Sequence, residues 1–204
     1  MADRFGIPQV VEYLDQMGIK VARMDHEQEV LELAFYGDQG QWRMIVGFQQ
    51  EDEARKMMFL IPHIGTITEK RRRECLEALM AVNYRIALGK FGLDPEDGEI
   101  RLEEVLPIAN HHLSFEQFQL AIGSVLQVAV IYQSLISRIV FGEVSPEEAL
   151  KACEQEFIED ETIQFQNEQD TSEAAEKPTR DESELDLNDV MEEVHRLLED
   201  RKDR

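Results

Sequence analysis

Several kinds of residue are scarce in this 204-residue chain, which has two cysteines, one tryptophan and 21 basic against 43 acidic residues. Cys75 and Cys153 lie far apart with no second thiol near either, which argues against a disulfide framework and fits a reducing compartment. The shortage of basic residues leaves a net charge of −22. Such a charge repels nucleic acids and anionic membranes and favours basic partners or simple solubility.

Motifs that carry chemistry are also missing. The sequence has no glycine-rich phosphate loop and no nucleophile elbow. A calcium loop around Gly98 would need an oxygen ligand at Leu93, and no bidentate acid follows at the required spacing. His111 and His112 are adjacent and would point apart, and the other histidines show no ligand spacing towards them. We therefore expect no catalytic residues, no metal and no cofactor.

One basic run, residues 70–73, stands out in this acidic chain. Four positive charges within one helical turn could contact phosphate or an acidic partner. No aromatic residues are interleaved with them, as single-strand binding would require. We interpret the run as the solvated start of a helix that could contact the acidic tail of its own chain.

Residues 117–137 contain no charged side chain and are long enough to span a bilayer. However, Gln119, Gly123, Gln127 and Ser134 fall near one helical face, which a lipid-facing helix would not keep polar. A buried helix of a soluble protein is the favoured interpretation. The N-terminal residues include acidic side chains and no apolar run, so we expect a cytoplasmic protein without membrane association.

The most informative stretch is 83–108, NYRIALGKFGLDPEDGEIRLEEVLPI. Apolar Phe91 and Leu93, and then Ile100 and Leu102, alternate with polar residues on either side of DPEDG, where Gly98 can adopt positive φ and close a hairpin. Entered from one helix and followed by a long uncharged one, this hairpin resembles the YbjN family of small bacterial proteins. That resemblance covers about the first two-thirds of the chain and implies a type III secretion chaperone-like fold, an interaction module without known chemistry.

The remaining patterns predict an α+β domain with one antiparallel sheet of five or six strands covered by helices, in the order α-β-β-β(-β)-α-β-β-α. We expect a helix at 8–17, strands at 19–24, 30–36, 42–48 and 57–61, and a loop at 49–53, with Pro62 ending the last strand. A capping box of Thr66 and Glu69 should open a second helix, and one of Ser114 and Gln117 a third helix reaching about residue 141.

An acidic C-terminal extension follows, because residues 143–204 hold 22 acidic and 7 basic residues. We divide the chain into a domain at 1–142, a short helix at 143–158, a disordered acidic linker at 159–183 and an amphipathic helix at 184–204. The last helix has apolar residues at helical spacing, and we predict that these bind a partner: Leu187, Val190, Met191, Val194, Leu197 and Leu198.

Three functions stay open at this point. The first is a non-catalytic protein-binding module, a chaperone-like or adaptor protein of the YbjN type, which binds a protein partner or its own domain through the C-terminal helix. The second is a regulator in bacterial stress or sensory signalling, a role that the family resemblance suggests. An enzyme is a remote third. A homodimer is also expected, because Val128, Val130, Ile131 and Leu135 leave apolar surface for a second subunit or for the helix after Ser145.

Overall fold

The computed structural model describes residues 5–37, 40–51, 54–108, 112–170 and 185–186. The elements, in chain order, are α1 (Ile7–Gln16), β1 (Arg23–Asp25), β2 (Val30–Gly37), β3 (Gly40–Glu51), β4 (Ala54–Thr66), the 3-10 helix η1 (Glu69–Arg71), α2 (Arg72–Arg85), β5 (Lys90–Leu93), β6 (Glu99–Ile108), α3 (Phe115–Tyr132), α4 (Leu135–Phe141), α5 (Pro146–Asp170) and β7 (Leu185–Asp186).

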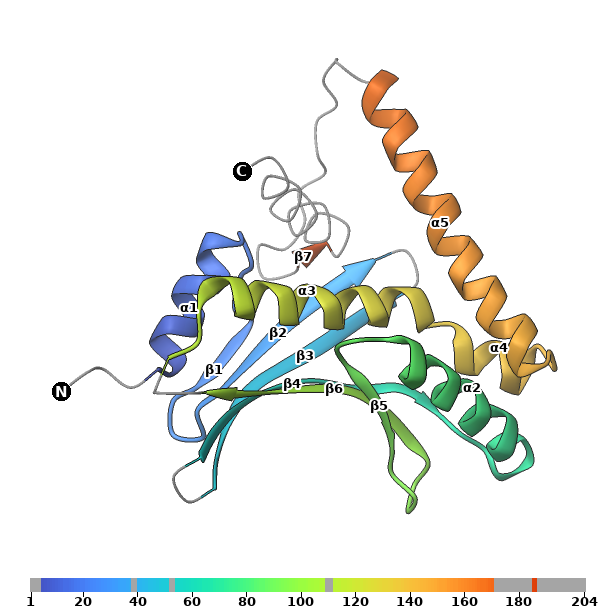
Figure 1. The fold of residues 1–204 in the computed structure, drawn as a ribbon, viewed down its shortest axis with the longest axis horizontal. Helices are drawn as coiled ribbons and strands as arrows, with labels where there is room; N and C mark the ends of the chain where they lie inside the picture. The colour runs from blue at the N-terminus through green and yellow to red at the C-terminus, as the bar shows by residue number, and fades with distance from the viewer. Residues whose placement is uncertain (1–4, 38–39, 52–53, 109–111, 171–184, 187–204) are drawn as a thin grey trace.

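One sheet organises these elements, with strand order β1-β2-β3-β4-β6-β5 and antiparallel pairing between all neighbours. The two-residue β7 pairs in parallel with β2. The helices lie on one side of the sheet, with α3 running across it, α1 at one end and α2 at the other (Figure 1). The predicted α+β class and six-stranded antiparallel sheet covered by helices are confirmed.

Helix α1 and strand β2 behave as predicted. Pro8 sits in the first turn of α1, where its missing N–H costs nothing, and Gly18 ends the helix with φ +69°. In β2, Leu31, Leu33 and Phe35 are fully buried on one face, as the alternating pattern requires. The predicted strand at 19–24 shortens to β1.

Two predicted breaks in the sheet are wrong. Gln49 and Gln50 continue β3 and pair with Lys56 and Arg55, so residues 49–51 of the expected loop at 49–53 belong to the strand. Pro62 lies inside β4, at an irregularity in the β4–β6 pairing between Ile61 and Gly65. A proline is tolerated there because residue 62 does not have to donate a backbone hydrogen bond to the neighbouring strand.

The start of α2 also differs from the prediction. Thr66 pairs with Glu99 in the sheet, so it cannot cap a helix, and η1 precedes α2 instead. The buried face of α2 carries Cys75, Ala78, Leu79 and Val82. The helix packs through this face and leaves Met80 exposed to solvent.

The hairpin of β5 and β6 confirms the turn reading. Gly98 has φ +78°, its N–H donates to the Asp94 carbonyl at 3.0 Å, and the Asp94 N–H donates to the Glu99 carbonyl at 2.9 Å. Asn83 of α2 fastens this hairpin to the helix by donating to the Phe91 carbonyl and accepting from the Phe91 N–H, at 3.0 and 2.8 Å.

The expected single helix up to residue 141 is broken into α3 and α4. Its predicted capping box is present, with Ser114 Oγ accepting from the Gln117 N–H. The break at Gln133 and Ser134 turns the chain so that Ile136 of α4 rests against Gly65 of β4. The stretch Phe115–Phe141 is long and apolar enough to cross a membrane by length and composition alone, yet over half of its most apolar part is buried here, where it lies on the sheet as a core helix.

The helix predicted to begin at Pro146 does so, and Ser145 Oγ accepts a hydrogen bond from the Glu148 N–H at 3.3 Å. It is longer than expected, because α5 continues to Asp170 and so enters the segment predicted as a linker at 159–183. Leu185 and Asp186 form β7, whereas a helix was predicted from residue 184. The rest of the predicted amphipathic helix, 187–204, lies outside the described residues.

Candidate protein-interaction surface

The sheet has two unlike faces. The face under the helices holds the core, with the side chains of Phe35, Met44, Phe59 and Leu102 all buried, and α3 lies over it with the ring of Phe118 at 5.6 Å from that of Phe59. None of the described helices covers the opposite face (Figure 1). Alternation along the strands therefore presents a second set of side chains there.

Four apolar side chains meet at the centre of this uncovered face. Ile45 of β3 stands opposite Leu60 of β4, and Met58 of β4 stands opposite Val105 of β6. Val105 is 39% exposed, and the other three are partly exposed. Side chains directly opposite on adjacent strands lie about 5 Å apart. They therefore form one continuous apolar patch, which we call the sheet patch (Ile45, Met58, Leu60 and Val105).

Charged residues of both signs surround the sheet patch. Arg43 lies 3.8 Å from Glu32 on one side, and Arg101 lies 3.1 Å from Glu103 on the other. The side chains of Arg43 and Arg101 are each about half exposed. The chain as a whole carries −22, so this face is unusual in balancing its charges, and an apolar centre with a mixed polar rim is the usual build of a protein-binding surface.

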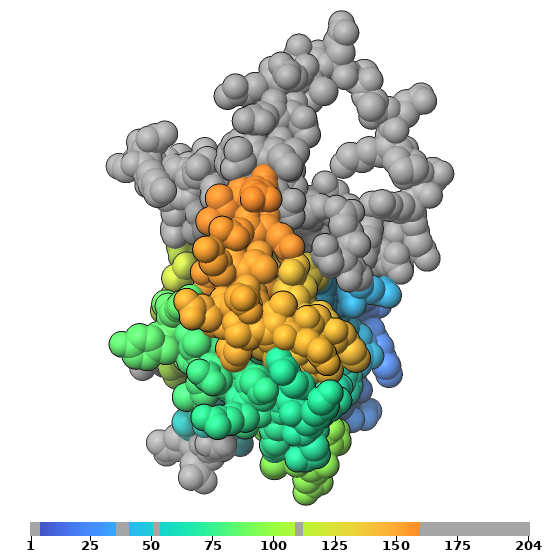
Figure 2. Space-filling model, turned by 90° about the vertical axis from the view of Figure 1, so that its right-hand side faces the viewer, coloured from blue at the N-terminus to red at the C-terminus, as the bar shows by residue number. Residues whose placement is uncertain are grey.

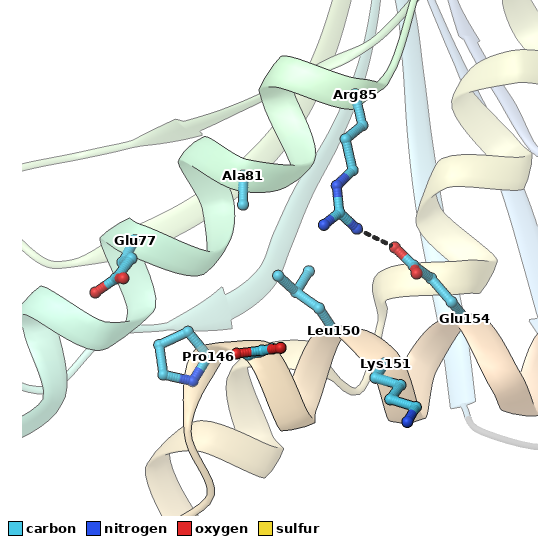
Figure 3. A pocket seen from close by; sticks show the side chains of 8 residues that line it. Glu77, Ala81, Arg85, Pro146, Leu150, Lys151 and Glu154 are labelled. Atoms are coloured by element: carbon cyan, nitrogen blue, oxygen red, sulfur yellow. Dashed lines mark hydrogen bonds and ion pairs between the residues drawn. The ribbon is translucent and has the colours of Figure 1, made fainter.

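A pocket lies between α2 and α5. Figure 2 shows these two helices next to each other, together with α4, at one end of the molecule. The pocket has a volume of about 340 Å³ and is lined by Glu77, Ala81, Arg85, Pro146, Glu147, Leu150, Lys151 and Glu154. Arg85 and Glu154 close one end through an ion pair of 2.8 Å (Figure 3). Its lining mixes charged side chains of both signs with the apolar Ala81, Pro146 and Leu150, which suits a helix–helix seam better than a predominantly apolar small-molecule site.

Next to this pocket, two large side chains of α2 project into solvent. Met80 is 66% exposed and Tyr84 is 92% exposed. They are four residues apart and so lie on one helical face. This small exposed pair is visible only in the structure.

The buried ionisable groups have structural roles. Arg55, only 4% exposed, donates to Glu29 at 2.6 Å and lies 4.4 Å from the centre of the Phe48 ring. Burial, followed by the nearby Glu154 carboxylate, raises the pKa of Tyr132 to about 12. Burial also raises the pKa of the Cys75 and Cys153 thiols, which keeps both protonated and unreactive at neutral pH.

Among the residues that the structure describes, no group of three histidine, cysteine or acidic side chains could hold a metal ion. His63 lies 3.1 Å from Glu99 on the protein surface, and His112 is exposed. Two residues of the basic run at 70–73 contact the chain just after α4. Arg71 donates to the Val144 carbonyl at 2.9 Å, and Lys70 lies 3.9 Å from Glu143. It thus contacts the first residues of the acidic extension, as the sequence interpretation allowed.

The partner-binding residues predicted from the sequence, Leu187, Val190, Met191, Val194, Leu197 and Leu198, all lie outside the described residues. The sheet patch was missed. Its residues belong to strands whose other face packs in the core, so the alternating pattern predicts only that one face of each strand is buried. The sequence does not show that helices cover one side of the sheet and not the other.

The predicted dimer surface on α3 is largely occupied. Val128 and Leu135 are buried, and α5 packs against α3 and α4. The helix after Ser145, one of the two occupants expected for that surface, is α5, whereas Val130 and Ile131 remain partly exposed.

The chain is similar to one protein family and to solved structures. The YbjN family model, described as "Putative bacterial sensory transduction regulator", matches residues 8–136. The chain is similar to the crystal structure of YbjN from E. coli, described as "a putative transcription regulator", with 16% identity over 61% of this chain and 87% of that one and a TM-score of 0.41. It is also similar to a chain of the ExsC–ExsE complex, with 19% identity over 65% of this chain and 97% of that one and a TM-score of 0.45. None of the curated proteins matches the chain in sequence.

Proposed function

The chain belongs to the YbjN family, and we propose that it is a non-catalytic protein-binding module, a chaperone-like or adaptor protein. The observation that carries this proposal is the uncovered face of the sheet. A sheet of this size normally hides apolar side chains on both faces or carries polar ones on the open face. Here four apolar side chains from three adjacent strands meet on the open face.

The geometry of the sheet patch points to a segment of a partner protein as its ligand. The patch is flat and lies across three strands, so it offers no enclosed volume for a small molecule. An amphipathic segment could lay its apolar side chains on Ile45 and Leu60 and set its charges against Arg43 and Arg101 at the rim.

A regulatory role in bacterial stress or sensory signalling is the second candidate, and the family description favours it. Such a regulator would also act by binding another protein, so the two candidates differ in the consequence of binding. A single stoichiometric client argues for a chaperone, whereas changed transcript levels without a client argue for regulation.

The test uses the full chain as bait, identifies the captured protein, and then measures the affinity of the purified pair by calorimetry. Ile45→Glu places a charge in the sheet patch and should weaken binding at least about tenfold, because a desolvated charge at an apolar contact costs more than 1.4 kcal/mol. Phe141→Glu is the matched control, since it adds the same charge to an apolar residue of α4 that is 83% exposed. If Phe141→Glu abolishes binding and Ile45→Glu does not, the partner binds α4 and the proposal is wrong.

Self-association is the remaining expectation. The exposed pair Met80 and Tyr84 is the apolar surface that we propose for binding a second copy. Light scattering of the full chain at micromolar concentration should give the dimer mass, and Tyr84→Ser should shift it towards the monomer. A monomer mass for the unaltered chain would refute dimerisation.

A further inference from the structure

β7 fixes where the C-terminal segment meets the domain. Leu185 lies beside Phe35, and Asp186 lies beside Tyr36, in parallel register on the edge of β2. β1 pairs only with residues 30–32 of this strand, so β7 continues along the part of the edge that β1 leaves open. β7 therefore ends, at Asp186, beside the C-terminal end of β2.

Helix α3 lies above this end of the sheet. Its two sides, which we call flanks, face opposite edges of the sheet. Tyr132 marks one flank, because its ring lies 6.4 Å from that of Phe91 in β5 and its hydroxyl donates to Glu154 of α5. Since β5 and β2 lie towards opposite edges of the sheet, the other flank of α3 faces β2. That flank carries Gln119, Gly123, Leu126 and Val130, spaced at i, i+4, i+7 and i+11.

This flank has the features of a helix-packing surface. It is uncharged, and the glycine in its middle permits close approach of a second backbone. Gln119 is 3% exposed and its Nε2 has no hydrogen-bond partner. A buried amide donor without an acceptor is costly, so an acceptor from a segment outside the described residues would satisfy it.

The direction and length of the flank match residues 187–198. Phe118 lies over Phe59, and Ile136 lies against Gly65, so α3 and α4 run along β4 in the strand direction that β4 shares with β2. The chain thus leaves β7 near the Val130 end of the flank. A helix of residues 187–198 would be about 18 Å long, and the flank from Val130 back to Gln119 is about 16 Å long.

We propose that residues 187–198 bind in cis as a helix antiparallel to α3, with their apolar face on the flank of Gln119, Gly123, Leu126 and Val130. The six apolar residues at helical spacing supply the buried face, and the acidic residues between them remain in solvent. The free carbonyl groups at the helix C-terminus end near Gln119 and can accept from its Nε2. This inference goes beyond the proposed function, because the flank lies on the opposite side of the sheet from the sheet patch.

Cysteine cross-linking in the full chain tests the proposed geometry. Val130→Cys with Leu187→Cys should form a disulfide within one chain under mild oxidation, whereas Val130→Cys with Leu198→Cys should not. A tether raises the effective concentration to about millimolar, so at about 10 micromolar protein the intramolecular product should exceed the intermolecular one by about 100-fold. A covalent dimer would assign the flank to the helix of a second copy. Absence of the product, or equal yields from both pairs, would overturn the docking.

A second measurement does not depend on introduced cysteines. Trp42, the only tryptophan of the chain, pairs with Phe35 at the β7 end of the sheet. Replacing Val190, Val194 and Leu197 by serine should detach the helix and shift the Trp42 emission to longer wavelength. Replacing Glu192, Glu193 and Arg196 by serine changes the other face of the same helix and should leave the emission unchanged. Circular dichroism verifies that both variants are folded, and identical emission from the two would refute the proposal.

Discussion

Replacement of Gly98 by valine tests how the β5–β6 hairpin is joined to the rest of the domain. Gly98 has φ +78°, a conformation that costs a β-branched residue about 1–2 kcal/mol. The structure adds a second cost. A Cβ at this position would lie 2.6 Å from the carbonyl oxygen of Ile67, a backbone atom that cannot move aside by rotation of a side chain.

Relieving that contact requires the chain around Ile67 to move away from the turn. The Ile67 N–H donates to the Gly98 carbonyl at 2.9 Å, and loss of this buried hydrogen bond adds about 1 kcal/mol. The total loss of unfolding free energy should be about 2–4 kcal/mol, which for a chain of this size lowers the melting temperature by roughly 5–15 °C.

Gly18→Val is the matched control. Gly18 also has positive φ, at +69°, but nothing lies within 4 Å of the position of its Cβ. This variant should therefore lose only the conformational term of about 1–2 kcal/mol. Urea unfolding followed by circular dichroism measures both variants. If Gly98→Val is no less stable than Gly18→Val, the contact with Ile67 carries no energy and the reasoning fails.

Three further variants test other contacts. Glu29→Gln should cost about 1 kcal/mol by urea unfolding, because it leaves Arg55 buried without its ion pair, and an equal loss from Glu27→Gln on the surface would contradict this. Asn83→Ala should cost about 2 kcal/mol through loss of two hydrogen bonds to the hairpin, and a loss below half of that would show that the bonds are replaced by water. Because the pKa of Tyr132 is raised from 10.0 to about 12 in the folded chain, its contribution to stability is complete below pH 10 and is lost as the pH rises from 10 to 12. The melting temperature of Tyr132→Phe should therefore fall less steeply over that interval, and parallel curves would refute the assignment.

The uncovered sheet face and the flank of α3 give the molecule two separate surfaces. The first is made of strands and faces solvent, and the second is made of one helix beside the β2 edge. Ile45→Glu perturbs the first surface, and the serine variants of the C-terminal segment perturb the second. Loss of partner binding in only one of them therefore shows which surface binds the partner.

Local patterns in the sequence determined much of this fold. The DPEDG turn placed Gly98 correctly because such a hairpin closes through a residue with positive φ, which glycine adopts without strain. Ser114 with Gln117 marked a helix start because capping depends on residues three positions apart. Strict alternation identified the core face of β2. Each of these features depends on contacts between near neighbours in the chain.

Other features were decided by contacts between distant segments. Pro62 stays in β4 because the register of β6 shifts opposite it, and the polar residues Gln49 and Gln50 join β3 because backbone pairing with β4 does not require apolar side chains. Met80 is exposed because the packing of α2 on the sheet buries Leu79 and Val82 instead. The sheet patch exists because all the described helices lie on one side of the sheet. The sequence by itself therefore determined which segments fold locally and how they are capped, whereas the tertiary structure alone decided which apolar side chains remain available for binding.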